Sequence, residues 1–356
     1  MRTLSDAQLA EDFLTIVITS SLPSNNIIFL NMVHVLVIGA SSWIAKKLVD
    51  SLIQKGGFGN YRVTHLTLAD VEEPDIPSDS SNMCVNALAV DMTNSSHVSA
   101  MLGNLPQFIF HLAAITDQVE ADVDVGYAVI LEGSLLLLET MRKLGDYQPR
   151  LVFASSVDFY HTPQIAANQA NTFSTAHATQ KAIEEMLEDS TRKGVVTATS
   201  IRLPIIVIRP DSSGTVAFSY LSSVLRDPWH GKEAELLPIS KSSMLTIASW
   251  RAAVGFLLHA AVYEPVLPAD RILTMPGISL TVQETINTLE RVAGREAIQH
   301  IRCASNSVDV EYASKLSAQC IETERAQELG FHSDESLESI LIQYANEEHF
   351  PIMSNN

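Results

Sequence analysis

From residue 32 onward, the apolar and polar positions of the chain alternate between two periods. Short runs rich in Val, Ile and Leu, of which residues 33–39 are the first, are typical of buried parallel strands. Longer stretches with apolar residues every three to four positions follow them and predict helices. Strand and helix in this alternation predict a parallel sheet covered on both faces. The predicted strands are residues 33–39, 62–70, 86–91, 106–114, 149–156 and 197–210, and the predicted helices between them include 43–56, 126–145 and 175–193.

The alternation of strands and helices ends after Pro210. Loops follow there, interleaved with helices expected near residues 217–226, 250–263, 281–293 and 334–346. We therefore expect an α/β fold with a Rossmann-type, doubly wound parallel sheet over residues 32–210. Residues 211–356 are expected to form mainly a smaller C-terminal substrate-binding cap, with some elements returning to the sheet. Residues 1–31 precede the first recognisable element and are expected to form an N-terminal extension. Ligands of such folds bind at the carboxyl ends of the strands.

Composition narrows the range of partners. Apolar residues make up 46% of the chain, which is enough for a sizeable core, and the formal net charge is −18. This balance argues against nucleic acid and anionic membrane surfaces, because both require clustered Lys and Arg. Cys84, Cys303 and Cys320 are few, odd in number and far apart in the sequence, which predicts neither a disulfide framework nor a metal site. We expect a cytoplasmic protein that acts on a small molecule and has no metal, nucleic-acid partner or membrane partner.

The turn after the first strand bears on cofactor binding. A nicotinamide dinucleotide needs glycines in this turn, a helix N-terminus facing the pyrophosphate, and an acidic residue that ends the second strand. The turn reads GASSWIA (residues 39–45), so Gly39 is present while Ser42 and Ala45 occupy the positions of the second and third glycines. Asp70 is placed to bind ribose hydroxyls and would favour NAD over NADP. Because Ser42 adds a side chain near the phosphate, the sequence supports NAD only weakly, and Gly39 and Asp70 could instead merely build the sheet. The candidate cofactor-binding residues are Gly39, Ser42, Trp43, Ile44, Asp70, Asp91, Met92, Ala113, Ala114 and Pro204.

Several stretches resemble the extended short-chain dehydrogenase/reductases, also called NAD-dependent epimerase/dehydratases. They include ASSVDFY (154–160), IFHLAAITDQVEADVDVGYAV (109–129), ATQKAIEEML (178–187), IRLPIIVIRP (201–210) and GISLTVQETINTLERVAG (277–294). Within that family the likeness is to D-erythronate dehydrogenase-type enzymes, and it runs from about residue 32 to residue 348. It implies the Rossmann fold, an NAD-dependent activity, and a homodimer through helices 126–145 and 175–193.

The resemblance also implies a catalytic Ser, Tyr and Lys. Carried over by position, Ser156 matches the Ser and Lys181 the Lys, whereas His177 stands at the Tyr position. The Asn that the family uses in its proton relay is replaced by Ile130. The catalytic candidates are therefore Ser156, His177 and Lys181, and the loop after the fifth strand supplies Asp158, Tyr160 and His161 as candidate substrate contacts.

His177 decides the interpretation of this site. It stands four residues before Lys181, so the two side chains can meet on one helix face. A nearby ammonium group disfavours the imidazolium, and a neutral imidazole is a competent general acid or base. Imidazole is shorter than phenol, however, and a displacement of about 1 Å can cost on the order of 100-fold in rate. We expect hydride transfer to be impaired unless another group, such as Tyr160, takes the proton; alternatively, His177 only fills the cavity of the Tyr.

Three functions follow from these observations. The first is a repurposed enzyme that isomerises, eliminates or cyclises a small specialised metabolite, cycloaddition included, with His177 as acid or base and Ser156 as hydrogen-bond donor. The second is an NAD-dependent dehydrogenase or epimerase of a hydroxy acid or a related hydroxyl or ketone substrate. The third is a non-catalytic ligand-sensing module. The departures around the site favour the first.

Overall fold

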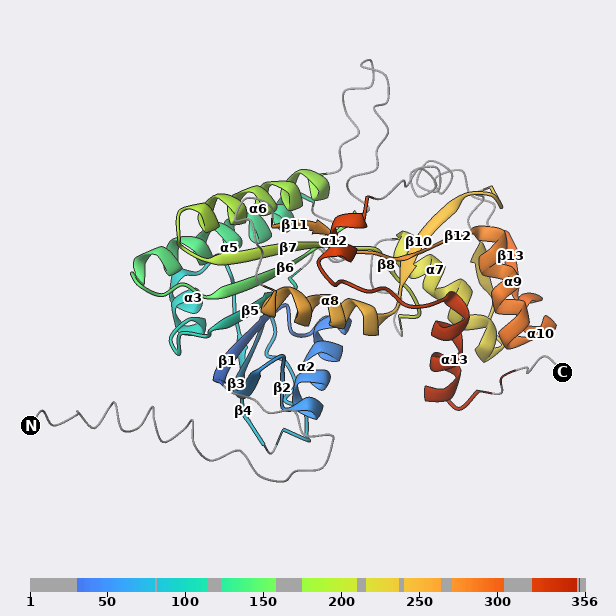
Figure 1. Ribbon diagram of the computed structural model, residues 1–356, viewed down its shortest axis with the longest axis horizontal. Helices are drawn as coiled ribbons and strands as arrows, with labels where there is room; N and C mark the ends of the chain where they lie inside the picture. The colour runs from blue at the N-terminus through green and yellow to red at the C-terminus, as the bar shows by residue number, and fades with distance from the viewer. Residues whose placement is uncertain are drawn as a thin grey trace, which may run out of the picture.

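The chain is described here from a computed structural model, which covers residues 31–80, 82–113, 123–157, 175–209, 216–236, 240–263, 271–303, 322–350 and 352. The largest element is an eight-stranded sheet in the order β11-β7-β6-β5-β1-β3-β2, with β4 paired to β3 (Figure 1). Apart from the short β2, the strands pair in parallel. The strands are β1 (Asn31–Ile38), β2 (Gly57–Phe58), β3 (Tyr61–Asp70), β4 (Cys84–Ala89), β5 (Phe108–His111), β6 (Arg150–Ser156), β7 (Thr197–Leu203) and β11 (Ile272–Thr274).

Helices cover both faces of this sheet, as the apolar strands predict. The helices α2 (Trp43–Lys55) and α8 (Trp250–Val262) lie on one face, and α3 (Ser95–Met101), α5 (Val123–Lys143) and α6 (Thr175–Arg192) lie on the other (Figure 1). Alternate residues of β1 serve the two cores: Val35 packs toward α2 and α8, and Leu36 packs toward α3 and α5. The doubly wound α/β fold is therefore confirmed.

The order of the strands creates a topological switch point at the carboxyl ends of β1 and β5, and the space there is the candidate crevice. Strand β1 lies between β3 and β5, so the chain leaves β1 toward one side of the sheet and later returns to its other side. The loops after β1 and β5 therefore diverge at their carboxyl ends. In open α/β sheets this switch point is where ligands bind.

A smaller body follows in the C-terminal third. It contains a three-stranded sheet in the order β12-β10-β8 and a two-stranded sheet of β13 and β9. A separate hydrophobic core joins these strands to the surrounding helices. Its elements are β8 (Ile205–Ile206), α7 (Val216–Arg226), the 3₁₀ helix η2 (Asp227–His230), β9 (Ala234–Leu236), β10 (Met244–Ala248), β12 (Ile278–Thr281), α9 (Val282–Ala293), α10 (Arg295–Ile298), β13 (Ile301–Cys303) and α13 (Leu337–Glu347), while α12 (Glu324–Glu328) packs near β11.

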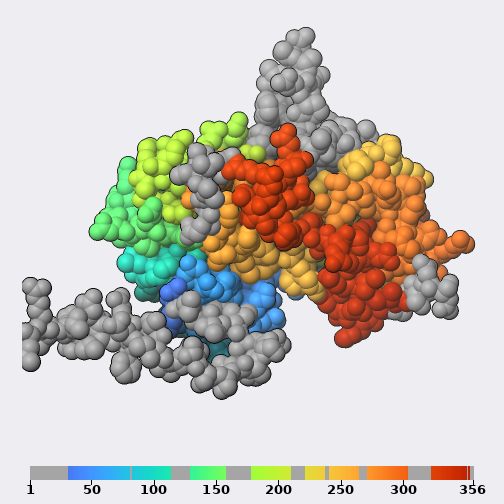
Figure 2. Space-filling model, viewed as in Figure 1, coloured from blue at the N-terminus to red at the C-terminus, as the bar shows by residue number. Residues whose placement is uncertain are grey.

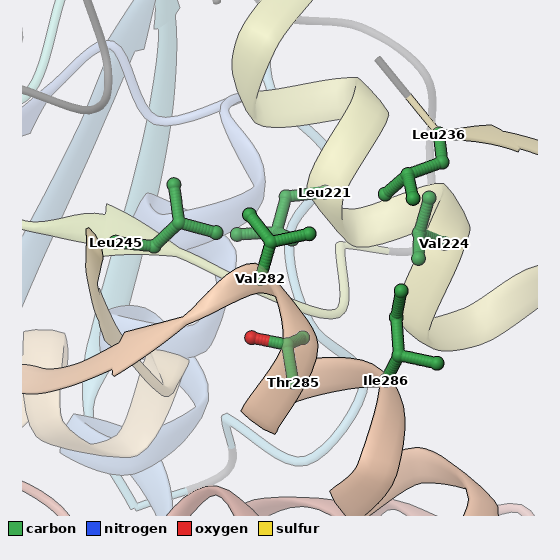
Figure 3. A pocket seen from close by; sticks show the side chains of 7 residues that line it. All are labelled: Leu221, Val224, Leu236, Leu245, Val282, Thr285 and Ile286. Carbon is green, nitrogen blue, oxygen red and sulfur yellow. The ribbon is translucent and has the colours of Figure 1, made fainter. Parts of the chain in front are cut away.

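The core of the smaller body is closely packed. Figure 3 shows an apolar void between α7, β10 and α9, whose volume is about 10 Å³. A void needs about 10–15 Å³ to hold one water molecule. This space is therefore a packing defect and not a ligand site.

One predicted strand was wrong in extent. The stretch 197–210 was expected to be continuous, but β7 ends at Leu203 and the next two residues after Pro204 form β8 in the other sheet. Proline has no backbone N–H and cannot donate to a ladder. Pro204 thus ends one strand and lets the chain cross from the large sheet to the small one.

Candidate functional site

Gly39 directly follows β1, at the point where the loops after β1 and β5 approach each other before they diverge. Its φ is +79°, and a Cβ built on it would lie 2.5 Å from the amide nitrogen of Ala113. Both the backbone conformation and the close approach therefore require glycine. The result is a side-chain-free floor at the switch point, to which Ala113 contributes from the facing loop.

Ser42 replaces a glycine without obstructing the loop. Its φ is −65°, a conformation open to any residue, and it is the N-cap of α2. Its hydroxyl donates to the carbonyl oxygen of Gly39 at 2.8 Å and accepts from the amide of Ala45 at 3.4 Å. The side chain that we expected near the phosphate is thus engaged with the loop's own backbone, and Ala45 is fully buried against the sheet.

Asp70 ends β3 beside the same loop. One carboxylate oxygen accepts from the amide of Ser41 at 2.8 Å, and the other accepts from the amide of Val71 at 2.7 Å. These two bonds hold a negative charge at the rim of the crevice. The glycine floor, the capped N-terminus of α2 and this carboxylate together fit a nicotinamide dinucleotide.

The remaining cofactor candidates differ in their surroundings. Asp91 is exposed, and hydrogen bonds from the hydroxyl and amide of Thr93 lower the pKa of its carboxyl group. Met92 packs against α5: a Cβ built on Gly133 of this helix would lie 2.6 Å from the Cβ of Met92. Trp43 and Ile44 pack together at the seam with the smaller body. Pro204 is buried at the strand break, and Ala114 lies outside the described residues.

The catalytic candidates are carried by β6 and α6. Ser156 is the last residue of β6, and Lys181 is an exposed residue of α6. The helix contains His177 as predicted, but its side chain lies outside the described part of the structure, as do Asp158, Tyr160 and His161. The structure therefore shows the two elements side by side and leaves the roles of these residues as predictions.

Sequence reasoning missed the residue that joins these two elements. The side-chain oxygen of Gln180 accepts from the amide of Ser156 at 3.2 Å and from the hydroxyl of Ser155 at 3.1 Å. Gln180 precedes Lys181 directly, so these two hydrogen bonds, which we call the clamp, fix the end of β6 against the turn of α6 that carries the lysine. Its only signal in the sequence is this adjacency.

A buried histidine beneath the crevice was also missed. His111 ends β5, is fully buried, and makes a 3.2 Å contact between its Nε2 and the hydroxyl of Ser134. Burial lowers the pKa of His111 to about 4, so the ring is neutral near pH 7. It is a structural residue that links β5 to α5.

A doubly wound sheet with a glycine floor after β1, a carboxylate after β3, and a Ser and a Lys on β6 and α6 defines the extended short-chain dehydrogenase/reductase class. The model of the NAD dependent epimerase/dehydratase family matches residues 35–214, and the chain belongs to that family. The resemblance inferred from the sequence is thereby confirmed.

Relatives match nearly the whole chain. The D-erythronate dehydrogenase of Cupriavidus necator is 32% identical over 321 residues, which are 87% of this chain and 97% of that protein. A D-erythronate dehydrogenase of Haemophilus influenzae is 29% identical over 87% of this chain and 98% of that protein. The chain is thus similar over its length to enzymes of the dehydrogenase branch.

Solved structures with the same fold also match nearly the whole chain. The crystal structure of a nucleoside-diphosphate-sugar epimerase from Agrobacterium tumefaciens is 34% identical, with a TM-score of 0.82 over 93% of this chain and 98% of that one. A UDP-glucose 4-epimerase from Thermus thermophilus in complex with NAD shares the fold, with 18% identity and a TM-score of 0.64 over 86% of this chain and 96% of that one. Both structures therefore share the overall fold of this chain.

The comparisons correct our first functional interpretation. They favour a dehydrogenase or epimerase over the isomerase, lyase or cyclase that the departures around His177 had suggested, and they give no support to specialised metabolism. Within the described residues, no cluster of His, Cys, Asp and Glu has the makings of a metal site. None of the helices in that part of the chain has the length and apolar character to traverse a lipid bilayer.

Proposed function

We propose that the protein is an NAD-dependent dehydrogenase that oxidises a hydroxyl group of a small hydroxy acid, with D-erythronate as the first candidate. The observation that carries this proposal is the crevice after β1 and β3, where Gly39 requires a bare backbone and Asp70 is held as a hydrogen-bond acceptor. The relatives named D-erythronate dehydrogenase, of which this chain spans nearly the full length, supply the substrate class.

Each part of the site has a role in this proposal. The bound NAD supplies the acceptor for the hydride. The backbone at Gly39 and the N-terminus of α2 bind the pyrophosphate, and Asp70 accepts from the ribose hydroxyls. The hydroxyl of Ser156 donates a hydrogen bond to the substrate oxygen. Lys181 supplies a positive charge near the ribose.

His177 takes the place of the family's tyrosine and is proposed to accept the proton of the substrate hydroxyl. A neutral imidazole can do so near pH 7. Because its nitrogen cannot reach the position of a phenolic oxygen, the substrate must lie closer to α6 or transfer its proton through a water molecule. We therefore expect a slow enzyme rather than an inactive one.

The experiment is an NAD-reduction assay on the full chain with D-erythronate and a panel of other small hydroxy acids. We expect reduced nicotinamide to form, and Lys181→Met and His177→Gln to lower kcat by about tenfold or more. Glu185→Gln, an exposed change on the same helix, is the matched control and should leave the rate unchanged.

Binding separates the remaining alternatives. NAD at 100 times its Kd should raise the free energy of unfolding by about 2.7 kcal/mol. Stabilisation by NAD without turnover of any hydroxy acid would replace the dehydrogenase by the ligand-sensing module. If NAD does not stabilise the protein and no hydroxy acid is turned over, the proposal is contradicted altogether.

A homodimer through α5 and α6 belongs to the same proposal. Leu135 on α5 is 46% exposed, and a second copy packed on this helix would cover it. Analytical ultracentrifugation should give twice the monomer mass, and Leu135→Glu should shift the protein toward the monomer.

A further inference from the structure

A second recess lies away from the crevice after β1. It is a cleft of about 320 Å³ between α2 and the N-terminus of α8 on one side and η2 and α13 on the other. Figure 2 shows the recess between the blue surface over α2 and the red surface over α13. Its volume is at the lower end of the range for small-molecule sites, which often form between domains.

The lining of the cleft is rich in cationic groups, although the chain carries a net charge of −18. Lys47, Arg226, Lys232 and Arg251 all line it. Arg226 is paired with Asp227, and Arg251 with Glu347. Of the described residues, none forms an ion pair with Lys47 or Lys232. The carboxylate of Glu348 also lines the cleft, so four cationic side chains face three carboxylates and one positive charge remains in excess to attract an anion.

An aromatic surface lies between the cations. The indole of Trp250 has the ammonium group of Lys47 at 4.8 Å from its ring centroid and the guanidinium of Arg251 at 4.3 Å. These contacts hold the ring in place. Trp43 and Ile340 add apolar surface to the same cleft. A ligand that fits would combine a flat apolar body with one negative charge.

The backbone at the cleft is strained. Ile208 lines the cleft with a φ of +61°, in the left-handed region that β-branched residues rarely adopt. The next residue, Arg209, holds its guanidinium 5.8 Å from the ring centroid of Trp43. Strained backbone of this kind persists where the surroundings enforce it, and it gathers at ligand sites.

The cleft is separate from the proposed cofactor site. Among those cofactor and catalytic candidates that the structure describes, only Trp43 lines it; Gly39, Asp70, Ser156 and Lys181 do not. We propose that this cleft is a second ligand site, which binds a small aromatic carboxylate between Trp250 and the ammonium groups of Lys47 and Lys232. Such a ligand would bridge the large sheet body and the smaller body.

Benzoate is the probe for the test, because it has a flat ring and one carboxylate. All three tryptophans of the chain report on the cleft. Trp43 and Trp250 line it, and Trp229 packs on Tyr344, another lining residue. We expect saturable quenching of tryptophan fluorescence and a matching calorimetric isotherm, with Kd on the order of 1 mM or tighter for a ligand of this size. Benzamide, which is neutral, should bind at least tenfold more weakly.

Two substitutions and a control test the assignment. Lys47→Met and Lys232→Met should each weaken benzoate binding by about tenfold, the loss of one charge-assisted hydrogen bond. Lys46→Met removes the same charge from the position of α2 that precedes Lys47, outside the cleft, and should leave Kd within twofold. Equal effects of Lys47→Met and Lys46→Met would overturn the proposal. So would one-for-one displacement of benzoate by NAD, or no saturation up to tenfold above the expected Kd.

Discussion

The close approach of two loops at Gly39 makes a quantitative prediction for Gly39→Ala. The new methyl group would lie 2.5 Å from the amide nitrogen and 2.7 Å from the Cα of Ala113. Both atoms belong to the backbone, so no side-chain rotation relieves the overlap. Ordinary contact requires about 3.4 Å, and the loops after β1 and β5 must therefore separate by roughly 1 Å.

Two costs contribute to the magnitude. Overpacking of this kind costs about 1–3 kcal/mol. An alanine at φ +79° adds about 1–2 kcal/mol, because the Cβ crowds the backbone in the left-handed region. We expect Gly39→Ala to lower the free energy of unfolding by about 2–5 kcal/mol, a large share of the total stability of a typical domain.

A matched control isolates the overlap. Gly194, which follows α6, has a similar φ of +73°, but a Cβ there meets nothing within 4 Å. Gly194→Ala should therefore show only the conformational cost of about 1–2 kcal/mol. Urea unfolding of the two variants, with unchanged m-values, measures the difference. Thermal shifts with NAD should show weakened binding for Gly39→Ala alone. Equal destabilisation by the two substitutions would refute the claim that the loops touch at Gly39.

Three further substitutions test other parts of the structure. Gln180→Ala removes the acceptor for the Ser156 amide, so kcat of the proposed oxidation should fall about tenfold without loss of the NAD thermal shift. Gln180→Glu keeps an acceptor and should retain most of the original kcat. An unchanged kcat in Gln180→Ala would show that this hydrogen bond does not position Ser156. His111 has a pKa lowered from 6.5 to about 4 by burial, so the unfolded chain binds its proton more readily, and roughly 3 kcal/mol of stability should be lost as pH falls through this window. His111→Gln should flatten that pH dependence of urea unfolding. Asp334 accepts from the amide of Ser249 at 2.8 Å and also from its hydroxyl, so Asp334→Ala should cost about 1–3 kcal/mol in a thermal melt, and a change below 0.5 kcal/mol would contradict this.

The fold was readable from the sequence because local and tertiary preferences agree. The stretch 250–263 was predicted as a helix and is α8 (Trp250–Val262), which begins where the Ser249 side chain caps the amide of Ala252. The apolar, β-branched runs likewise became buried parallel strands. The exception was residues 197–210, because hydrophobicity continues across Pro204 while the missing N–H ends the ladder.

The site was readable only in part. Gly39 and Asp70 stand at positions that the fold fixes, so sequence spacing correctly placed both of them beside the turn after β1, and their role in cofactor binding stays a prediction. Ser42 was identified, but the hydrogen bonds between its hydroxyl and its own loop were not, because only coordinates reveal them. Gln180 and the second cleft were missed for another reason: both depend on contacts between segments far apart in the chain.

The clamp between β6 and α6 bears on the histidine at the tyrosine position. Besides Gln180, the buried carboxylate of Glu184 on α6 accepts two hydrogen bonds from the guanidinium of Arg202 on β7, at 3.1 and 2.7 Å. Two successive turns of the helix are thus tied to two strands. Sliding α6 to bring a shorter imidazole toward the substrate would break both attachments, at a cost of several kcal/mol. These attachments keep α6 at a fixed distance from the sheet. In the role proposed for His177, the reach that an imidazole lacks relative to a phenol must therefore come from the position of the substrate or from a bridging water, and not from a shift of the helix.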